Sequence, residues 1–316
     1  MPWVEKYRPK TIDDIILSPL VEKLIRGFLD EIGGIHIILS GNPGVGKTTT
    51  IRCIAKFLLG DNLDEGYLEL NAADDRGVKI MSTVVPPFCK KIVNFRCPKI
   101  ILLDEADNLT QNCQNDIDNM IKEYGSKTKF MFTCNDSKKI NEDIQSMCRI
   151  VHFSEPPVVP AKKYLKNICK KENISYTSSG IDMIFYVAGS DMRKSINDLQ
   201  KTSYTFGSIT KENVLKICNI PDPDMIKGII EKCYTESINV VYFDLMRCID
   251  DGYVFNDIIN GFVNVVTNMQ DIDEGLKIKL MCIINKTRII ITSKVNSPLQ
   301  LGAMVARIYG VIRETI

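Results

Sequence analysis

The sequence predicts an α/β domain with a parallel sheet and a phosphate-binding loop, followed by two all-α domains. The first sign is an apolar run at residues 35–39 that leads into a glycine-rich loop and then into helical periodicity. The second is another buried-strand pattern, residues 99–104, that ends in acidic residues. The third is a proline-rich stretch at residues 156–160, after which only helical periods follow.

The composition is that of a chain that folds into two or three cores. Of its 316 residues, 45% are hydrophobic and 25% are charged, and the net charge is +1. No apolar run approaches the roughly 20 residues of a membrane helix, and the charged N-terminus is unlike a signal peptide, so we expect no membrane partner and a cytosolic or nuclear location. Eleven scattered cysteines and two distant histidines do not form a zinc-site pattern.

The glycine-rich loop predicts a site for nucleotide phosphates. Its pattern is GxxxxGK[ST], in which glycines let backbone N–H groups converge on phosphate oxygens at a helix N-terminus. Lys47 would reach the β- and γ-phosphates, and Thr48 would bind Mg²⁺. A chance glycine-rich turn is the alternative, which the flanking strand and helix disfavour. The candidate nucleotide-binding residues of this segment are Gly41, Asn42, Pro43, Gly44, Val45, Gly46, Lys47, Thr48 and Thr49.

Acidic residues at the end of the second strand supply what ATP hydrolysis further requires. Asp104 and Glu105 follow the strand at its carboxyl end, where ligands bind in parallel sheets. We expect Asp104 to hold Mg²⁺ and Glu105 to polarise the attacking water. The next apolar run ends at Asn135, whose amide could orient that water or sense the γ-phosphate. A turn-forming asparagine at a strand end fits Asn135 equally well.

Together these segments resemble an AAA+ ATPase, and more narrowly a small subunit of the replication factor C clamp loader. The resemblance spans the whole chain, and it is strongest to the subunit-two type of eukaryotes. The narrower resemblance rests on PWVEKYRPK (2–10), LELNAADDRG (68–77), ILLDEAD (101–107), TCN (133–135) and GSDMRKSINDLQ (189–200). The resemblance to the subunit-two type rests on LSGNPGVGKTTTIRCIA (39–55) and QLGAMVARIYGVI (300–312).

The resemblance implies further site residues. In such subunits the N-terminal segment folds over the nucleotide base, which implies that Val4, Arg8 and Ile16 surround adenine, although an ordinary packed arm would have the same composition. Arg193 corresponds to the second sensor, a lid arginine that reaches the γ-phosphate. The implied catalytic residues are therefore Lys47, Glu105, Asn135 and Arg193, and the implied Mg²⁺ ligands are Thr48 and Asp104.

The resemblance also implies a plan of three domains. Residues 1–153 would form the AAA+ ATP-binding domain. Residues 154–220 would form a helical lid, broken at Gly180, Gly189 and Gly207. Residues 221–316 would form a helical collar through which neighbouring subunits pack into a ring. A helical cap on a monomer is the alternative for this last part.

One departure from the family concerns an arginine that acts on the neighbouring subunit. The family carries Ser-Arg-Cys, whose arginine stabilises charge in the neighbour's ATP site, whereas this chain has Met147 there. Methionine cannot carry that charge. In an extended segment Arg149 would lie about 6 to 7 Å further along on the same face. The simpler interpretation is that Arg149 belongs to the next strand and the finger is lost.

Two other departures remove positive charge from surfaces that would meet a neighbour or DNA. Asp118 and Asn119 stand in place of an arginine pair. Ser82 and Pro86 stand where an arginine and a lysine would face template phosphates, and Pro86-Pro87 should end or kink that helix. The remaining basic residues there, as phosphate contacts or as solvated surface, are Lys79, Lys90 and Lys91.

The function implied is that of an ATP-binding subunit in a heteropentameric, nuclear clamp loader. ATP and Mg²⁺ binding would tighten the ring around primer-template DNA and hold a sliding clamp open, and hydrolysis would release the closed clamp. Because the finger for this site comes from another subunit, the isolated chain should be a slow ATPase. One alternative is an ATP-sensing structural subunit without productive hydrolysis. Another is an unrelated AAA+ motor such as a branch-migration helicase, which the missing winged DNA-binding domain disfavours.

Overall fold

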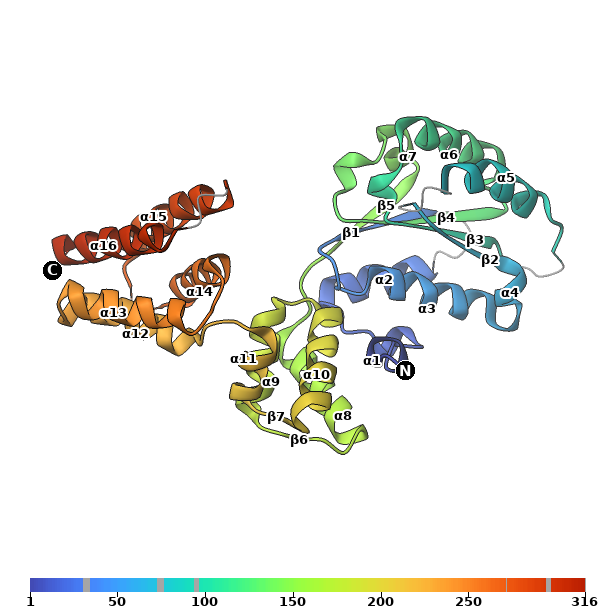
Figure 1. Ribbon diagram of the computed structural model, residues 1–316. Coiled ribbons are helices and arrows are strands. Elements are labelled where there is room, and N and C mark those ends of the chain that lie inside the picture. Colours follow the sequence, from blue (N-terminus) through green and yellow to red (C-terminus); the bar gives the residue numbers. More distant parts are fainter. Residues whose placement is uncertain (31–34, 73–76, 94–96, 271, 294–296, 316) are drawn as a thin grey trace. The chain divides into compact units, whose positions relative to one another are not determined.

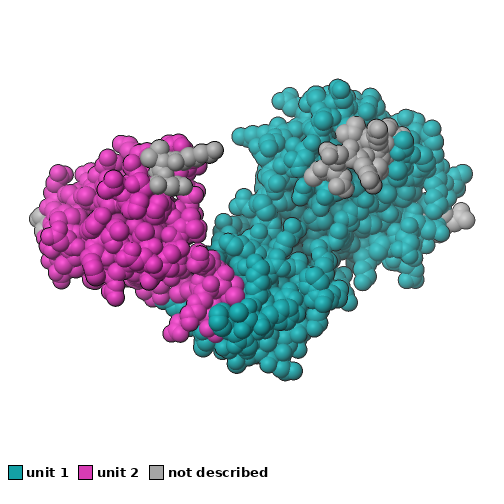
Figure 2. Space-filling view, in the orientation of Figure 1, with its two compact units in different colours: residues 1–211 teal, residues 212–316 magenta. Residues whose placement is uncertain are grey.

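The computed structural model describes residues 1–30, 35–72, 77–93, 97–270, 272–293 and 297–315. They form two compact units, residues 1–211 and 212–316, which Figure 2 distinguishes by colour. Unit 1 contains a parallel sheet and the helices around and after it, and unit 2 is helical. This confirms the predicted fold class. Within the described ranges, no helix combines the length and the apolar character needed to cross a membrane.

Unit 1 is organised around a five-stranded parallel sheet with the strand order β2-β3-β4-β1-β5 (Figure 1). Parallel strands place their carboxyl ends at one edge, so the loop after β1, Asp104 at the end of β3, Glu105 after it and Asn135 after β4 share that edge. The predicted first strand starts one residue later than expected and continues further. The strands are β1 His36–Gly41, β2 Tyr67–Asn71, β3 Lys99–Asp104, β4 Thr128–Cys134 and β5 Cys148–Phe153.

Helices cover both faces of this sheet, as Figure 1 shows. Because successive side chains of a strand point to opposite faces, Ile37 and Leu39 of β1 join one hydrophobic core while Ile38 joins the other. The helices of the first face are α2 Pro19–Asp30 and α3 Lys47–Leu59, and those of the second are α5 Gly77–Lys90, α6 Gln111–Tyr124 and α7 Glu142–Ser146. Shorter helical segments are α1 Trp3–Lys6, η1 Ile12–Asp14, η2 Gly60–Asn62, α4 Leu63–Gly66, η3 Ala106–Asn108 and η4 Ser137–Lys139.

The expectation was that Pro86-Pro87 would end or kink helix α5, and the first of these two outcomes is wrong. The helix continues to Lys90, because Val85 and Cys89 are buried in the core and hold both turns. In addition, the buried Lys99 ammonium donates to the carbonyls of Phe88, Cys89 and Lys91 at 2.6 to 2.7 Å. These contacts offset a proline penalty of about 3 kcal/mol. The side chains of Lys79 and Ser82 lie outside the described residues.

A helical segment follows the sheet within unit 1, at the place of the predicted lid, and is called the lid below. It consists of α8 Val158–Lys171, α9 Ser178–Ala188 and α10 Met192–Phe206, with two short strands, β6 Ser175–Tyr176 and β7 Ser208–Ile209. The predicted breaks at Gly189 and Gly207 are confirmed, since both follow a helix in the left-handed conformation (φ 56° and 69°). The break at Gly180 is wrong. Gly180 lies inside α9, where a Cβ would come within 2.3 Å of the Ile209 carbonyl oxygen.

Unit 2 is helical, and α11 Lys211–Cys218 spans its boundary with unit 1. The helices that share one apolar core are α12 Pro223–Thr235, α13 Ile238–Asp250, α14 Phe255–Asn268, α15 Glu274–Thr292 and α16 Pro298–Thr315. Phe262 of this core is fully buried. The division between the units falls at the start of α11, whereas the lid was expected to end at residue 220. The plan of three domains remains a prediction.

Candidate functional site

A cavity of about 220 Å³ lies at the carboxyl edge of the sheet in unit 1. The phosphate-loop segment, the ends of β3 and β4, the N-terminal segment and helix α10 all line it. The predicted residues that it brings together are Val4, Arg8, Ile16, Pro43, Gly44, Val45, Gly46, Lys47, Thr48, Thr49, Asp104, Glu105, Asn135 and Arg193. Gly41 and Asn42 do not line the cavity, but they begin the loop and their carbonyl oxygens contact Lys47.

The loop turns into α3 through a residue that only glycine suits. Gly46 is the N-cap of α3 with φ 100°, in the left-handed region that side chains disfavour. Since Gly46 has no side chain to cap the helix, the first N–H groups of this 13-residue helix are left for another acceptor. The positive end of α3 therefore suits an anion such as a phosphate group.

Lys47 is a buried cation surrounded by neutral oxygen atoms. Its Nζ donates to the carbonyl oxygens of Gly41 and Asn42 at 2.7 and 2.8 Å, and to Oδ1 of Asn135 at 3.3 Å. Only 8% of the residue is exposed, and burial lowers the pKa of Lys47. A desolvated ammonium that has carbonyl and amide partners gains strongly from an added anion. Lys47 thus fits a nucleotide phosphate.

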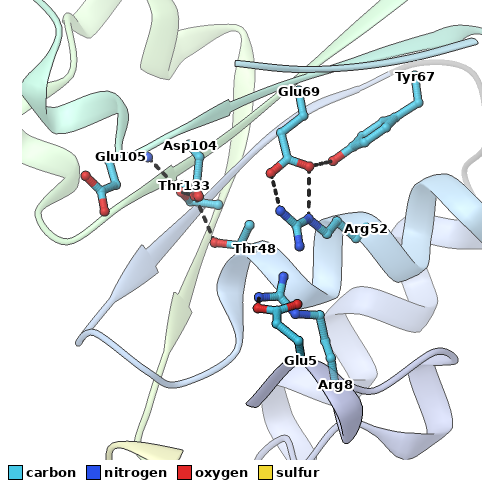
Figure 3. Close-up of polar contacts among 9 residues, drawn as sticks. All are labelled: Glu5, Arg8, Thr48, Arg52, Tyr67, Glu69, Asp104, Glu105 and Thr133. Carbon is cyan, nitrogen blue, oxygen red and sulfur yellow. Dashed lines mark hydrogen bonds and ion pairs between the residues drawn. The ribbon is translucent and has the colours of Figure 1, made fainter. Parts of the chain in front are cut away.

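Two hydroxyls converge on Asp104, as Figure 3 shows. Thr48 Oγ1 donates to Asp104 Oδ1 at 2.8 Å, and Thr133 Oγ1 donates to the same carboxylate oxygen. Thr133 Oγ1 also accepts a hydrogen bond from the Glu105 backbone N–H at 3.1 Å. The hydroxyl of Thr48 and the carboxylate of Asp104 are hard oxygen ligands on adjacent elements, α3 and β3. They fit a Mg²⁺ ion that takes its other ligands from water and phosphate.

Glu105 adopts a backbone conformation that few acidic residues adopt. Its φ of 55° and ψ of 42° lie in the left-handed region, at a cost of about 1 to 2 kcal/mol. The side chain is exposed, and Oε2 accepts from Asn108 Nδ2 at 3.4 Å. Such strain collects at functional sites, where surrounding contacts hold it. The left-handed turn separates the Glu105 side chain from the buried strand and leaves it at the cavity.

Asn135 and Arg193 reach the cavity from different parts of the unit. Asn135 follows β4, and its N–H donates to Asp107 Oδ2 at 3.3 Å while its Oδ1 accepts from Lys47. Arg193 is the second residue of α10 and is exposed. The lid also contacts the loop directly, because the Met192 N–H donates to the Gly44 carbonyl at 3.3 Å. A Cβ on residue 44 would lie 1.8 Å from Oδ1 of Asp191.

The comparisons identify the family. A family model described as "Replication factor C C-terminal domain" matches residues 221–307, and one described as "ATPase family associated with various cellular activities (AAA)" matches residues 37–155. A putative replication factor C small subunit of Acanthamoeba polyphaga mimivirus is 49% identical over 314 residues, which cover 99% of this chain and 98% of the relative. The chain belongs to the replication factor C small-subunit family.

Other relatives extend this family to eukaryotes. Replication factor C subunit 4 of Schizosaccharomyces pombe is 36% identical over 98% of this chain and 91% of its own length. Replication factor C subunit 2 of Arabidopsis thaliana is 35% identical over 99% and 94%. The Thermotoga maritima RuvB Holliday junction branch migration motor superposes with a TM-score of 0.57 and 17% identity, covering 80% of this chain and 90% of that one. At that identity the match shows the fold alone.

In this replication factor C small subunit, Met147 and Arg149 lie on opposite sides of the sheet. Met147 ends α7 in a helical conformation (φ −90°, ψ −5°) and packs against the core under α5, α6 and α7. Arg149 lies in β5, between Cys148 and Ile150 of that same core, so strand alternation puts it on the other face. The extended geometry that would bring Arg149 onto the face of Met147 is wrong. The prediction that Arg149 belongs to the next strand is confirmed.

Asp118, where a basic residue was expected, has a partner within its own helix. It is buried, and its Oδ2 accepts from Lys122 at 2.6 Å, one helical turn further on. Asn119 beside it is exposed. The Asp118 carboxylate is therefore used in a contact inside α6.

Several residues that line the cavity were missed by sequence reasoning. Thr133 lies within the TCN motif, but nothing in the motif shows that its hydroxyl contacts two acidic residues. Tyr164 and Ile196 come from the lid and meet the N-terminal segment in the cavity. No local pattern pairs such distant segments, so only the folded chain reveals these contacts.

Proposed function

We propose that this chain is an ATP-binding subunit of a replication factor C clamp loader. In this proposal it joins other subunits in a heteropentamer that opens a ring-shaped sliding clamp and places it on primer-template DNA in the nucleus. The observation that carries the proposal is the convergence of Lys47, Thr48, Asp104, Glu105 and Arg193 on one cavity. The names of relatives aligned over nearly the whole chain support the assembly.

Different residues of the cavity have different roles in nucleotide binding and hydrolysis. Lys47 and the N-terminal end of α3 bind the phosphates, and Arg193 adds a cation from the lid. Thr48 and Asp104 would hold Mg²⁺, which neutralises charge on the β- and γ-phosphates. Glu105 orients the attacking water and accepts its proton. Val4, Arg8 and Ile16, which also line the cavity, would surround the base.

The chain offers little help to the ATP site of a neighbouring subunit. Met147 lies where the family has its finger arginine, and its thioether packs into the core instead of carrying charge. The finger for the site of this chain comes from another subunit. We therefore propose slow hydrolysis by the isolated chain and faster hydrolysis in the complete ring, by a factor on the order of 10³ or more.

Turnover in the reconstituted complex tests the proposal. Glu105→Gln should keep nucleotide affinity within about threefold and reduce hydrolysis by about 10² or more, because Gln cannot accept a proton. Glu123→Gln, at an exposed position on α6, serves as the matched control and should change neither quantity. Clamp loading measured alongside shows whether hydrolysis at this site is used.

Three results would count against the proposal. If Glu105→Gln leaves turnover and loading intact, the chain is an ATP-sensing structural subunit. If the purified chain alone hydrolyses ATP as fast as the complex, no neighbouring finger is needed. If the chain forms homohexamers that displace DNA strands, it works as a separate AAA+ motor.

A further inference from the structure

The N-terminal segment that lines the cavity is attached to the lid. Helix α1 packs beside α10, as Figure 1 shows. The Trp3 backbone N–H donates to Gln200 Oε1 at 2.9 Å, and the Trp3 ring meets the Tyr204 ring edge to face with centres 5.8 Å apart. Trp3 is 3% exposed and has both of these partners in α10.

Glu172, at the C-cap of α8, forms a second attachment. Its Oε1 accepts from Lys6 Nζ at 2.6 Å and also from the Tyr7 hydroxyl. These two donors hold the pKa of Glu172 below its usual range. Tyr164 of the same helix donates its hydroxyl to the Tyr7 carbonyl, and Lys171 Nζ lies 5.7 Å from the centre of the Tyr7 ring. Tyr7 is thus held through its hydroxyl, its carbonyl and its ring.

The partners of the segment change directly after Arg8. The Pro9 carbonyl accepts from Cys53 Sγ of α3 at 3.5 Å, and Asp13 forms an ion pair with Arg26 of α2 at 2.6 Å. Both partners belong to helices on the sheet. Trp3, Lys6 and Tyr7 are therefore attached to the lid, Arg8 forms an ion pair with Glu5 of the same segment, and Pro9 and Asp13 are attached to the sheet helices.

We propose that Glu172 is a positioning residue for nucleotide binding, because it joins Val4 and Arg8 on the base side of the cavity to the lid that carries Arg193. The inference rests on the proposed function. Base-side residues and the lid arginine then move as one body. A molecule that carries both an adenine base and a phosphate chain holds this body at two points, so the base contributes to closing the lid over the phosphates.

Trp3, the single tryptophan of the chain, reports this attachment directly. In the native chain of residues 1–316, we would measure Trp3 emission and the Kd for ADP by titration. Glu172→Ala should shift the emission to longer wavelength, since release of the segment exposes Trp3 to water. It should weaken ADP binding about 5- to 10-fold, allowing for the partial exposure of the contact. Tyr7→Phe should act in the same direction and more weakly.

Matched variants separate this role from general damage to the lid. Asp182→Asn removes another lid ion pair, Lys162–Asp182 at 2.7 Å, that does not involve the N-terminal segment. It should leave both the emission and the Kd unchanged. Glu172→Gln keeps an acceptor for Tyr7 and should recover part of the affinity lost in Glu172→Ala.

The possible results are distinct. The inference is overturned if Glu172→Ala binds ADP as well as the native chain does. If Glu172→Ala does not fold, the same result in both Glu172→Gln and Tyr7→Phe overturns it. It is also overturned if Asp182→Asn weakens binding equally, because the effect then belongs to the lid as a whole. If the native chain itself does not bind ADP, the proposed function fails, and the emission shift still shows whether Glu172 attaches the segment.

Discussion

Replacement of Thr133 by valine tests how the acidic end of β3 is held. Valine keeps the shape of this buried side chain, which is 2% exposed, and removes only its hydroxyl. That hydroxyl donates to Asp104 and accepts from the Glu105 N–H (Figure 3). Both proposed functions of the acidic pair, Mg²⁺ binding and water activation, depend on these two contacts.

The expected magnitude follows from the lost contacts. An N–H group left without its acceptor costs about 1 to 3 kcal/mol of unfolding free energy. The left-handed conformation of Glu105 costs about 1 to 2 kcal/mol. Without the hydrogen bond to Thr133, the backbone of Glu105 can relax out of this conformation. A loss of about 2 kcal/mol in a unit of this size lowers the unfolding temperature by roughly 4 to 8 °C. A displacement of Glu105 by about 1 Å reduces hydrolysis about 10²-fold.

Thermal unfolding of the chain and ATPase activity of the reconstituted complex measure the two effects. Nucleotide affinity without Mg²⁺ should stay within about threefold, since Lys47 and the loop are untouched. Thr133→Ser keeps the hydroxyl and should retain most activity. Thr128→Val alters an equally buried threonine about 16 Å away along β4 and should not affect hydrolysis. Native activity in Thr133→Val would refute the reasoning.

Three further predictions concern Lys47, the pair Met147 and Arg149, and His36. Lys47→Met should reduce nucleotide affinity at least about 100-fold, as titration calorimetry would measure. The unfolding temperature of the ligand-free chain should not fall, because a buried charge is removed. Retained affinity would contradict this prediction. Met147→Arg should raise ATP turnover of the complex at least about tenfold. Arg149→Ala should leave turnover unchanged, since the two residues lie on opposite faces of the sheet. Loss of turnover in Arg149→Ala would show that the faces are misassigned. Burial lowers the pKa of His36 to about 4, so the His36 imidazole of the folded chain stays neutral down to about that pH. In the unfolded chain the same imidazole gains a proton below about pH 6.5. The unfolding free energy should therefore fall by up to about 3 kcal/mol as the pH drops from about 6.5 to 4, and His36→Gln should remove that part of the loss in urea titrations at several pH values.

The phosphate loop and the acidic pair could be predicted from the sequence because each is contiguous. A run of glycines and Lys47 between a strand and a helix already determines where the loop N–H groups point. Asp104 and Glu105 directly follow a buried strand, and in a parallel sheet the end of a strand is where ligands bind. Local order along the chain was therefore enough to place these residues at one edge.

Local rules failed where packing opposed them. Pro86 and Pro87 predict the end of a helix, but core burial and the Lys99 ammonium keep α5 helical to Lys90. Gly180 predicts a break, yet it sits inside α9 because β7 approaches too closely for a Cβ. In both cases tertiary contacts that are absent from the local sequence outweigh an intrinsic preference of a few kcal/mol or less.

By itself, the sequence determined the family, the parallel sheet and most of the residues that line the cavity. Only the tertiary structure decided that Thr133 holds the acidic pair, that Met147 and Arg149 face opposite sides, and that Glu172 attaches the N-terminal segment to the lid. These relations depend on contacts between residues far apart in the chain. No periodicity or motif encodes such contacts, because the direction of a side chain is set by the elements that pack around it.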